Sequence, residues 1–325
     1  LLAGLADRFA LPVVPFNTRY FALSSLHPMF QGSVPGPLLR EADLVLVWET
    51  DVPWYPNADS PPAGARIVQI GEDPLYSRYP MRSFPSELTI RAASAPLLEA
   101  LEQALAKRSP DVAARHARLS KRSDGLRSGW IAEAERGGKG DACTNAWMNH
   151  CLRQIVDRDT IMVNEYSFRQ EYCPLPRPGS LLSISSAGGL GWGFGAALGA
   201  RLAARDRQVI AVLGDGAYMF ANPTACHFVA QKHDLPVLVV IYNNTLYGAV
   251  RRATLDMFEH GVAAADDGRL LADLGPAPAF ERIVEAHGGH GERVERPAEL
   301  PGALKRAAAA VRGGRQALVN VLCHG

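Results

Sequence analysis

The sequence lacks an excess of charge of either sign, and it lacks any apolar run long enough to cross a membrane. Its 325 residues carry 34 Lys and Arg against 33 Asp and Glu, for a formal net charge of +1. A protein that binds nucleic acid is expected to carry a basic excess, so this balance argues against such a partner. Glycine or a charged residue interrupts each apolar stretch before it reaches the roughly 20 residues of a spanning helix. We therefore expect neither a nucleic acid nor a membrane among its partners.

Cysteine is scarce and is not arranged in pairs. The five cysteines are scattered along the chain, without a Cys-x-x-Cys pair, at Cys143, Cys151, Cys173, Cys226 and Cys323. Their odd number and wide spacing argue against a disulfide framework and against a zinc site. Reduced, inert thiols and a cytoplasmic protein are the expectation.

The first residues have neither the basic segment nor the cleavage site of a signal peptide. The sequence starts at Leu1, and residues 1–9 already follow a helical pattern. We expect the chain to be the C-terminal part of a longer protein, or one piece of a split or processed enzyme.

Apolar residues make up 47% of the chain, enough for sizeable cores. Strand and helix patterns alternate, which predicts an α/β fold with two doubly wound parallel-sheet domains. We place the first domain at 1–106, a linker at 107–141 and the second domain at 142–325. The linker is basic, but interleaved acidic residues and few aromatics favour a solvated helix over a nucleic-acid patch.

Apolar runs and helical spacing locate the elements of both domains. Strands are predicted at 12–14, 43–48, 66–70, 88–90, 160–163, 181–184, 208–213, 236–242 and 316–322. Helices are predicted at 1–9, 95–106, 143–156, 193–204, 223–233 and 300–311. The continuous apolar run at 43–48 is typical of a strand covered on both faces.

Two of the predicted buried strands end in polar turns. The first turn is Gly214-Asp215-Gly216, and the second is Asn243-Asn244. The carboxyl ends of parallel strands line a common crevice, so both turns are expected to face it. Carboxylate and amide oxygens are hard donors that suit magnesium or calcium. Small residues at Gly216 and Ala217 would let backbone N–H groups approach a phosphate.

The segment from Gly214 through Asn244 resembles the signature of thiamine diphosphate-dependent enzymes, Gly-Asp-Gly followed by Asn-Asn. It is most similar to the group that contains acetolactate synthase and benzoylformate decarboxylase. Further similar segments are 186–191, 207–216, 243–251 and Asn164-Glu165 in the second domain, and 26–32 and 70–74 in the first. The resemblance covers nearly the whole chain. It implies the family's middle domain followed by its diphosphate-binding domain.

The resemblance also implies roles for individual residues. The metal ligands would be Asp215, the side chain of Asn244 and the backbone carbonyl of Leu246, with Asn243 bracing the turn. Gly188 would offer its carbonyl to the aminopyrimidine, and Leu190 would lie under the cofactor and force its bent shape, so both belong to the catalytic machinery. The remaining cofactor contacts would be Tyr166, Ser167, Gly214, Gly216, Ala217, Tyr218 and Tyr247.

The implied activity is that of a thiamine diphosphate- and Mg²⁺-dependent decarboxylase or carboligase acting on a 2-oxo acid. Family members take an activating glutamate from a pyrimidine-binding domain, and nothing in this chain resembles that domain. Glu165 and Glu171 lie on the wrong half of the site to replace it. A pyrimidine-binding domain, in cis or as a separate chain, is therefore implied, in a homodimer or homotetramer.

Several alternatives stay open. The chain could be a non-catalytic binding module or a subunit of a split enzyme, or an acyl-coenzyme A lyase or decarboxylase on the same scaffold. FAD binding is also open, although no residue pattern demands it. The glycine run 188–195 could be a dinucleotide fingerprint, but a Gly-Asp-Gly turn replaces the acidic residue expected after the next strand.

Basic side chains near the predicted site allow two interpretations. Arg251 and Arg252 could bind a substrate carboxylate or a coenzyme A phosphate, or they could be a solvated pair. The histidines at His27, His227, His233 and His260 are interpreted as packing or surface residues.

Overall fold

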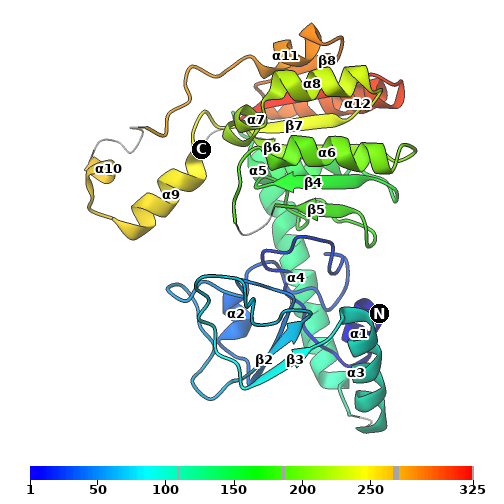
Figure 1. The fold of residues 1–325 in the computed structure, drawn as a ribbon, viewed down its shortest axis with the longest axis vertical. Coiled ribbons are helices and arrows are strands. Elements are labelled where there is room, and N and C mark those ends of the chain that lie inside the picture. Colours follow the sequence, from blue (N-terminus) through cyan, green and yellow to red (C-terminus); the bar gives the residue numbers. More distant parts are fainter. Residues whose placement is uncertain (109, 185–186, 266–270, 324–325) are drawn as a thin grey trace. The chain divides into compact units, whose positions relative to one another are not determined.

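The computed structural model describes residues 1–108, 110–184, 187–265 and 271–323 (Figure 1). The chain divides into two compact units, residues 1–128 and residues 129–325. The segment expected to be a linker holds helix α4 (Ala113–Gly138), which runs across the boundary between the units.

The first unit contains a small sheet whose three strands are all parallel, in the order β1-β2-β3. Helices α1 and α3 pack together through Leu5, Phe9 and Leu98. The elements of this unit before α4 are α1 (Leu2–Arg8), α2 (Gly36–Leu39), β1 (Leu44–Trp48), β2 (Arg66–Gly71), β3 (Leu88–Arg91) and α3 (Ser94–Arg108).

Two expectations for the first unit are corrected by the structure. Strand β1 lies at the edge of its sheet, and Leu44 and Leu46 are 47% and 40% exposed, so the strand is not covered on both faces. The apolar residues of β1 therefore do not show that the strand is covered on both faces. Residues 12–14 form no strand, because only Val13 pairs, in an isolated bridge to Phe30.

The second unit contains a sheet of six parallel strands in the order β5-β4-β6-β7-β9-β8. The strands are β4 (Ile161–Glu165), β5 (Leu181–Ser183), β6 (Val209–Gly214), β7 (Leu238–Asn243), β8 (His290–Val294) and β9 (Ala317–Leu322). Mixed helix and strand with parallel sheets confirms the predicted fold class.

Helices cover both faces of this sheet. Val209, Ala211 and Leu213 of β6 point to one face, where they pack in a common core with residues of α6, α8 and α11. Helix α12 packs against β7, β8 and β9, and it contacts α5. The helices are α5 (Asn145–Leu152), α6 (Trp192–Ala203), α7 (Asp215–Phe220), α8 (Pro223–Lys232), α9 (Gly248–Met257), α10 (Val262–Ala265), α11 (Phe280–Ala286) and α12 (Leu300–Arg312), with a 3₁₀ turn at Pro297–Glu299.

The register of the sheet decides where the site lies. Glu165 pairs with Leu213, and Gly214 pairs with Tyr242. The carboxyl ends of β4, β6 and β7 therefore lie side by side at the same end of the sheet, with β6 between the other two strands.

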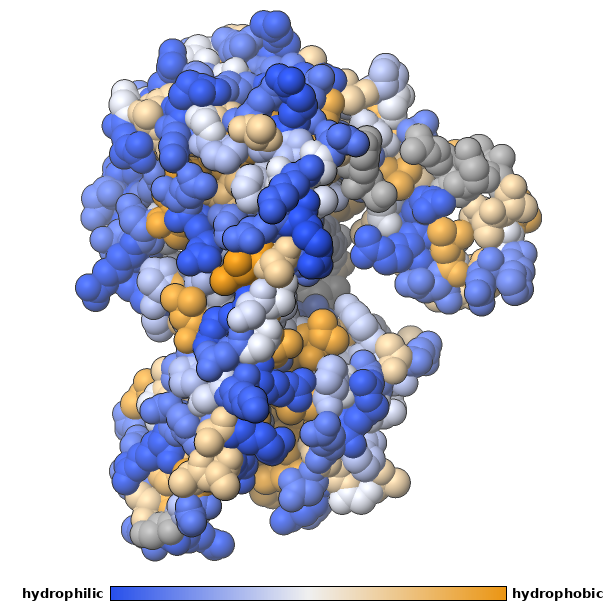
Figure 2. Space-filling view, turned by 180° about the vertical axis from the view of Figure 1, so that it is seen from behind, coloured by the Kyte–Doolittle hydropathy of each residue, from blue (hydrophilic) through white to orange (hydrophobic). Residues whose placement is uncertain are grey.

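Among the described residues, no helix is long and apolar enough to cross a bilayer. The face shown in Figure 2 is mainly hydrophilic, with apolar residues in scattered patches.

The cysteines behave as packing groups. All five are free, and burial raises the pKa of Cys143 to about 11 and of Cys173 to about 12. Thiols with such raised pKa values are poor nucleophiles at neutral pH.

Candidate functional site

The turns after β6 and β7 contact each other through Asp215. This carboxylate is 3% exposed, and it begins α7 directly after β6. Its Oδ1 accepts the N–H of Gly216 at 2.8 Å, and its Oδ2 accepts the N–H of Leu246 at 3.3 Å. Burial raises the pKa of Asp215, and these backbone N–H groups oppose the shift. The structure thus brings together the two strand ends that the sequence singled out.

Asn243 braces the second turn. Its Oδ1 accepts the N–H of Thr245 at 3.2 Å, and Thr245 has a φ of +56°. A β-branched residue rarely adopts this left-handed conformation, so the turn needs outside support. The N–H of Leu274 donates to the carbonyl of Thr245, and the N–H of Tyr247 donates to the carbonyl of Ala272. The bend that carries Asn244 and Leu246 is therefore held from two sides.

Gly216 lies where the chain approaches a ring closely. A Cβ on Gly216 would be 2.6 Å from Cε1 of Tyr247, so only glycine fits against this ring in its present place. The Tyr247 ring also meets Phe220 edge-on, with centroids 6.2 Å apart. The predicted cofactor residues Gly214, Gly216 and Tyr247 are thus assembled around Asp215.

The loop before α6 is held by Glu165, a residue whose role the sequence did not reveal. Glu165 is fully buried, and its Oε1 accepts the N–H of Gly191 at 2.7 Å. Its Oε2 accepts the N–H of Gly193 at 2.5 Å. Burial raises the pKa of Glu165, while the N–H donors oppose this shift. One carboxylate at the end of β4 therefore satisfies the first N–H groups of α6.

This clamp places the glycine-rich loop that carries the two predicted catalytic residues. Gly188 has a φ of +67°, and the Tyr166 hydroxyl lies 3.1 Å from where its Cβ would be. Gly191 has a φ of +90° and packs against the backbone of Phe220. Leu190, half-buried, lies between these two glycines. Ser186, the first residue of the resembling motif, lies outside the described residues.

A group of asparagines holds the loop after β4. The side chains of Asn145 and Asn149 both donate to the carbonyl of Ser167, at 2.8 and 2.9 Å. The N–H of Phe168 donates to Oδ1 of Asn164 at 2.8 Å. Ser167 is buried next to Gly214, whose Cβ position would lie 3.9 Å from the Ser167 Oγ. Predicted diphosphate contacts from β4 and β6 are therefore neighbours.

The side chain of Tyr218 does not point to this site. It is fully buried in the core, where its hydroxyl lies 2.8 Å from Nε2 of His227. Nδ1 of His227 lies 2.7 Å from Oε1 of Gln316, whose amide N–H groups donate to the carbonyls of His227 and His287. Nδ1 therefore carries the proton, and Nε2 accepts from Tyr218. A contact of Tyr218 with the cofactor would have to use its backbone.

This buried histidine should make stability depend on pH. Burial lowers the pKa of His227 to about 4, from 6.5. Between the unfolded pKa of 6.5 and the folded pKa of about 4, only the unfolded chain binds a proton at His227. The stability that the neutral, buried His227 contributes is therefore present above pH 6.5 and is lost as the pH falls toward 4. We expect His227 to lower the free energy of unfolding by about 2 kcal/mol between roughly pH 7 and pH 5.

Urea unfolding across this range measures the effect. The His227→Gln variant keeps a polar partner for Tyr218 and should lose this part of the pH dependence, whereas variation of the exposed His233 to Gln should preserve it. Equal pH dependence in wild type and His227→Gln would contradict the assignment.

The oxygen donors at the strand ends fit a magnesium ion. One buried carboxylate, one amide and one backbone carbonyl are hard oxygen donors of the kind that Mg²⁺ takes alongside phosphate oxygens and water. Among the described residues there is no cluster of three or more His, Cys, Asp or Glu side chains that could hold a metal alone. The oxygen donors of Asp215, Asn244 and Leu246 could serve a metal whose remaining ligands a diphosphate supplies.

Arg251 and Arg252 lie on α9, which follows the Asn244 turn and has no buried residue. Arg252 is exposed and Arg251 half-buried. Their position is compatible both with binding a substrate carboxylate or coenzyme A phosphate and with a solvated pair.

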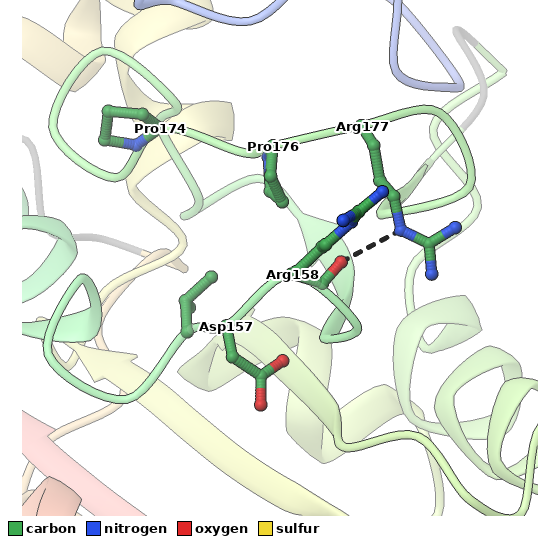
Figure 3. Close-up of a pocket in the computed structure, with 6 residues that line it drawn as sticks. Asp157, Arg158, Pro174, Pro176 and Arg177 are labelled. Carbon is green, nitrogen blue, oxygen red and sulfur yellow. Dashed lines mark hydrogen bonds between the residues drawn. The ribbon is translucent and has the colours of Figure 1, made fainter.

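A cavity of about 440 Å³ lies at the opposite end of the sheet, next to the amino ends of the strands (Figure 3). It is lined by residues that precede β4 and β5, among them Asp157, Pro174 and Pro176. Arg177 crosses it and donates from Nε to the carbonyl of Arg158 at 3.0 Å. Because it opens at the amino ends of the strands, it is separate from the site around Asp215.

Comparison with known proteins identifies relatives of this chain. Residues 165–321 match the family described as thiamine pyrophosphate enzyme, C-terminal TPP binding domain. The chain is 30% identical over 338 residues to a benzoylformate decarboxylase of Pseudomonas aeruginosa, covering 96% of this chain and 56% of the relative. It is 35% identical over 175 residues to a probable acetolactate synthase of Mycobacterium bovis, covering 53% of this chain and 30% of the relative.

A solved structure shows the same fold. It is a thiamine diphosphate-dependent 4-hydroxybenzoylformate decarboxylase of Rhodococcus jostii, with a TM-score of 0.74 at 23% identity. The match covers 99% of this chain and 58% of the other. The chain thus spans about half the length of the relatives that it matches throughout.

Proposed function

Since the chain belongs to the family of thiamine diphosphate-dependent enzymes, we propose that its second unit binds the diphosphate of this cofactor together with Mg²⁺. The observation that carries this proposal is the buried Asp215 carboxylate, which contacts the turn carrying Asn244 and Leu246. In the proposed site these three residues hold the metal. The backbone of Gly216, the N–H groups of Ala217 and Tyr218, and the loop at Tyr166 and Ser167 face the diphosphate.

The proposed activity is decarboxylation or carboligation of a 2-oxo acid. The bound cofactor supplies an electron sink for cleaving the bond next to a carbonyl. The chain's own residues hold and orient it, with Gly188 facing the aminopyrimidine and Leu190 supporting the bend between its two rings. The named activities of the decarboxylase and synthase relatives support this reaction class.

We further propose that a pyrimidine-binding domain, in cis or on a separate chain, completes the site in a homodimer or homotetramer. Glu165 is fully buried and holds the N–H groups of Gly191 and Gly193, so we assign it to the loop before α6 and not to activation of the aminopyrimidine. Large apolar side chains are exposed on α7 and α9 and directly after α9, as a partner surface would require. They are Met219, Phe220, Val250, Met257 and Phe258.

Calorimetric titration with thiamine diphosphate tests the proposal. Binding is expected to require Mg²⁺, and Asp215→Asn should weaken it about 30-fold or more, because removing a charged partner costs at least about 2 kcal/mol. Asp256→Asn removes the same charge from an exposed position on α9 and should bind like wild type. The titration is repeated with the chain joined to a pyrimidine-binding domain. Absence of Mg²⁺-dependent binding there, or unchanged binding by Asp215→Asn, would contradict the proposal.

A further inference from the structure

A line of three buried side chains runs from the Asn243 turn to helix α11. Nδ2 of Asn243 donates to Oδ1 of Asn320 at 3.0 Å, and Asn320 lies on the neighbouring strand β9. Nδ2 of Asn320 donates to Oε2 of Glu281 at 2.8 Å and to the carbonyl of Pro278 at 3.0 Å. The three side chains are 1%, 0% and 8% exposed, respectively. No role in the proposed site follows from the sequence motif for Asn320 or Glu281.

The acceptor at the far end decides how every amide in this line is oriented. The Glu281 carboxylate and the Pro278 carbonyl have only lone pairs to offer, so Asn320 must turn its NH₂ group toward them. Its Oδ1 then faces Asn243, which must present its own NH₂ group. Oδ1 of Asn243 is thereby left to accept the N–H of Thr245. A flipped amide at either position would set two donors or two acceptors against each other in a buried place.

The end of the line is the strained part of the turn. Thr245 is held at a φ of +56°, and Leu246 next to it donates to Asp215. A conformation of this kind persists only when its surroundings determine it. The hydrogen bond from Thr245 to Asn243 is one such determinant, and its direction depends on Asn320 and Glu281.

We propose that Asn320 and Glu281 are positioning residues of the turn that carries Asn244 and Leu246. They hold Asn243 in the orientation that fixes Thr245, and they thereby keep the oxygen donors of the turn in place before a cation arrives. The bracing itself stands on the contacts above. Its effect on Mg²⁺ rests on the proposed function.

Amide hydrogen exchange measures the bracing without any ligand. In Asn320→Ala, the Thr245 amide of the metal-free, isotope-labelled chain should exchange about tenfold faster than in wild type, because its acceptor is no longer oriented. Asn149→Ala removes another fully buried amide of the same unit and should leave the exchange of Thr245 within about twofold.

A pair of variants at position 281 separates orientation from packing. Glu281→Gln keeps an oxygen that can accept from Asn320, so Thr245 should exchange as in wild type. Glu281→Leu replaces that acceptor by an apolar side chain of similar size and leaves only the Pro278 carbonyl to orient Asn320, so exchange should rise, but less than in Asn320→Ala. Equal behaviour of the two variants, or unchanged exchange in Asn320→Ala, would overturn the proposal. Should Asn320→Ala fail to fold, the pair at 281 decides alone.

The Mg²⁺ concentration that supports half-maximal thiamine diphosphate binding tests the consequence for the site. It should rise about tenfold in Asn320→Ala and by a smaller factor in Glu281→Leu, while cofactor affinity at saturating Mg²⁺ stays within about twofold of wild type. General destabilisation would also weaken cofactor affinity at saturating Mg²⁺, and that result would overturn the metal-specific role. If the wild-type chain binds no cofactor, the proposed function falls, whereas the exchange of Thr245 still supports or overturns the bracing.

Discussion

Replacing Gly191 by alanine is expected to lower the free energy of unfolding of the second unit by about 3–4 kcal/mol. Gly191 has a φ of +90°, and a Cβ there would lie 2.6 Å from the carbonyl carbon and oxygen of Phe220. Left-handed strain in an L-residue costs about 1–2 kcal/mol, and forcing a methyl group against backbone adds about 1–3 kcal/mol. Backbone atoms cannot turn aside as a flexible side chain can. The loop carrying Leu190 or the end of α7 must therefore move.

Gly189→Ala is the matched control within the same loop. Among the described residues other than its two chain neighbours, no atom lies within 4 Å of the position of its Cβ, and no left-handed φ is required there. Its free energy of unfolding, measured by urea denaturation, should stay within about 1 kcal/mol of wild type. The proposed function adds that Gly191→Ala should lose cofactor binding, since both the Leu190 loop and α7 adjoin the site. Equal stabilities of the two alanine variants would contradict the close contact between Gly191 and Phe220.

Replacing Glu165 by alanine is expected to cost about 3 kcal/mol of stability. The variant would leave the N–H groups of Gly191 and Gly193 without their acceptor in the interior, and each unpaired buried donor costs about 1–3 kcal/mol. It would also remove a negative charge that complements the start of α6. The loss should be partial in Glu165→Gln, because one side-chain oxygen remains to accept one of the two N–H groups.

Urea unfolding of the Glu165 series measures these costs. Glu171→Ala removes a half-buried carboxylate from the loop that follows β4 and serves as the control, with an expected change within about 0.5–1 kcal/mol. Hydrogen exchange at the first turn of α6 should rise in Glu165→Ala and stay unchanged in Glu171→Ala. A stable Glu165→Ala with protected α6 amides would show that the clamp does not hold this loop.

The position of a strand in its sheet explains which elements could be read from the chain. Strands β6 and β7 are central and buried on both faces, so their sequences are nearly continuous apolar runs, which predict a strand. Strand β8 was missed because it lies at the edge of the sheet beside β9, and His290, Glu292 and Arg293 break its apolar pattern. Conversely, the apolar run of β1 predicted coverage that its edge position does not provide.

The same contrast holds for the candidate site. The turns at Gly214–Gly216 and Asn243–Asn244 could be predicted, because a short motif directly after a buried strand carries its own chemistry. The clamp from Glu165 to Gly191 joins residues 26 positions apart, and Asn243 and Asn320 lie 77 positions apart. Such pairings cannot be predicted from a single sequence, because a buried Asn or Glu side chain can form hydrogen bonds with several different groups.

The chain by itself determined its fold class, the positions of its main strands along the sequence and the placing of Asp215 and Asn244 at strand ends, because local apolar patterns and turn residues suffice for these. Only the tertiary structure decided that Tyr218 faces the core, that Glu165 holds the Leu190 loop, and that Glu281 orients Asn320 and Asn243. The physical reason is that a buried polar group takes whichever partner the packed sheet brings within hydrogen-bonding distance, and that partner is chosen by register and not by neighbours in sequence.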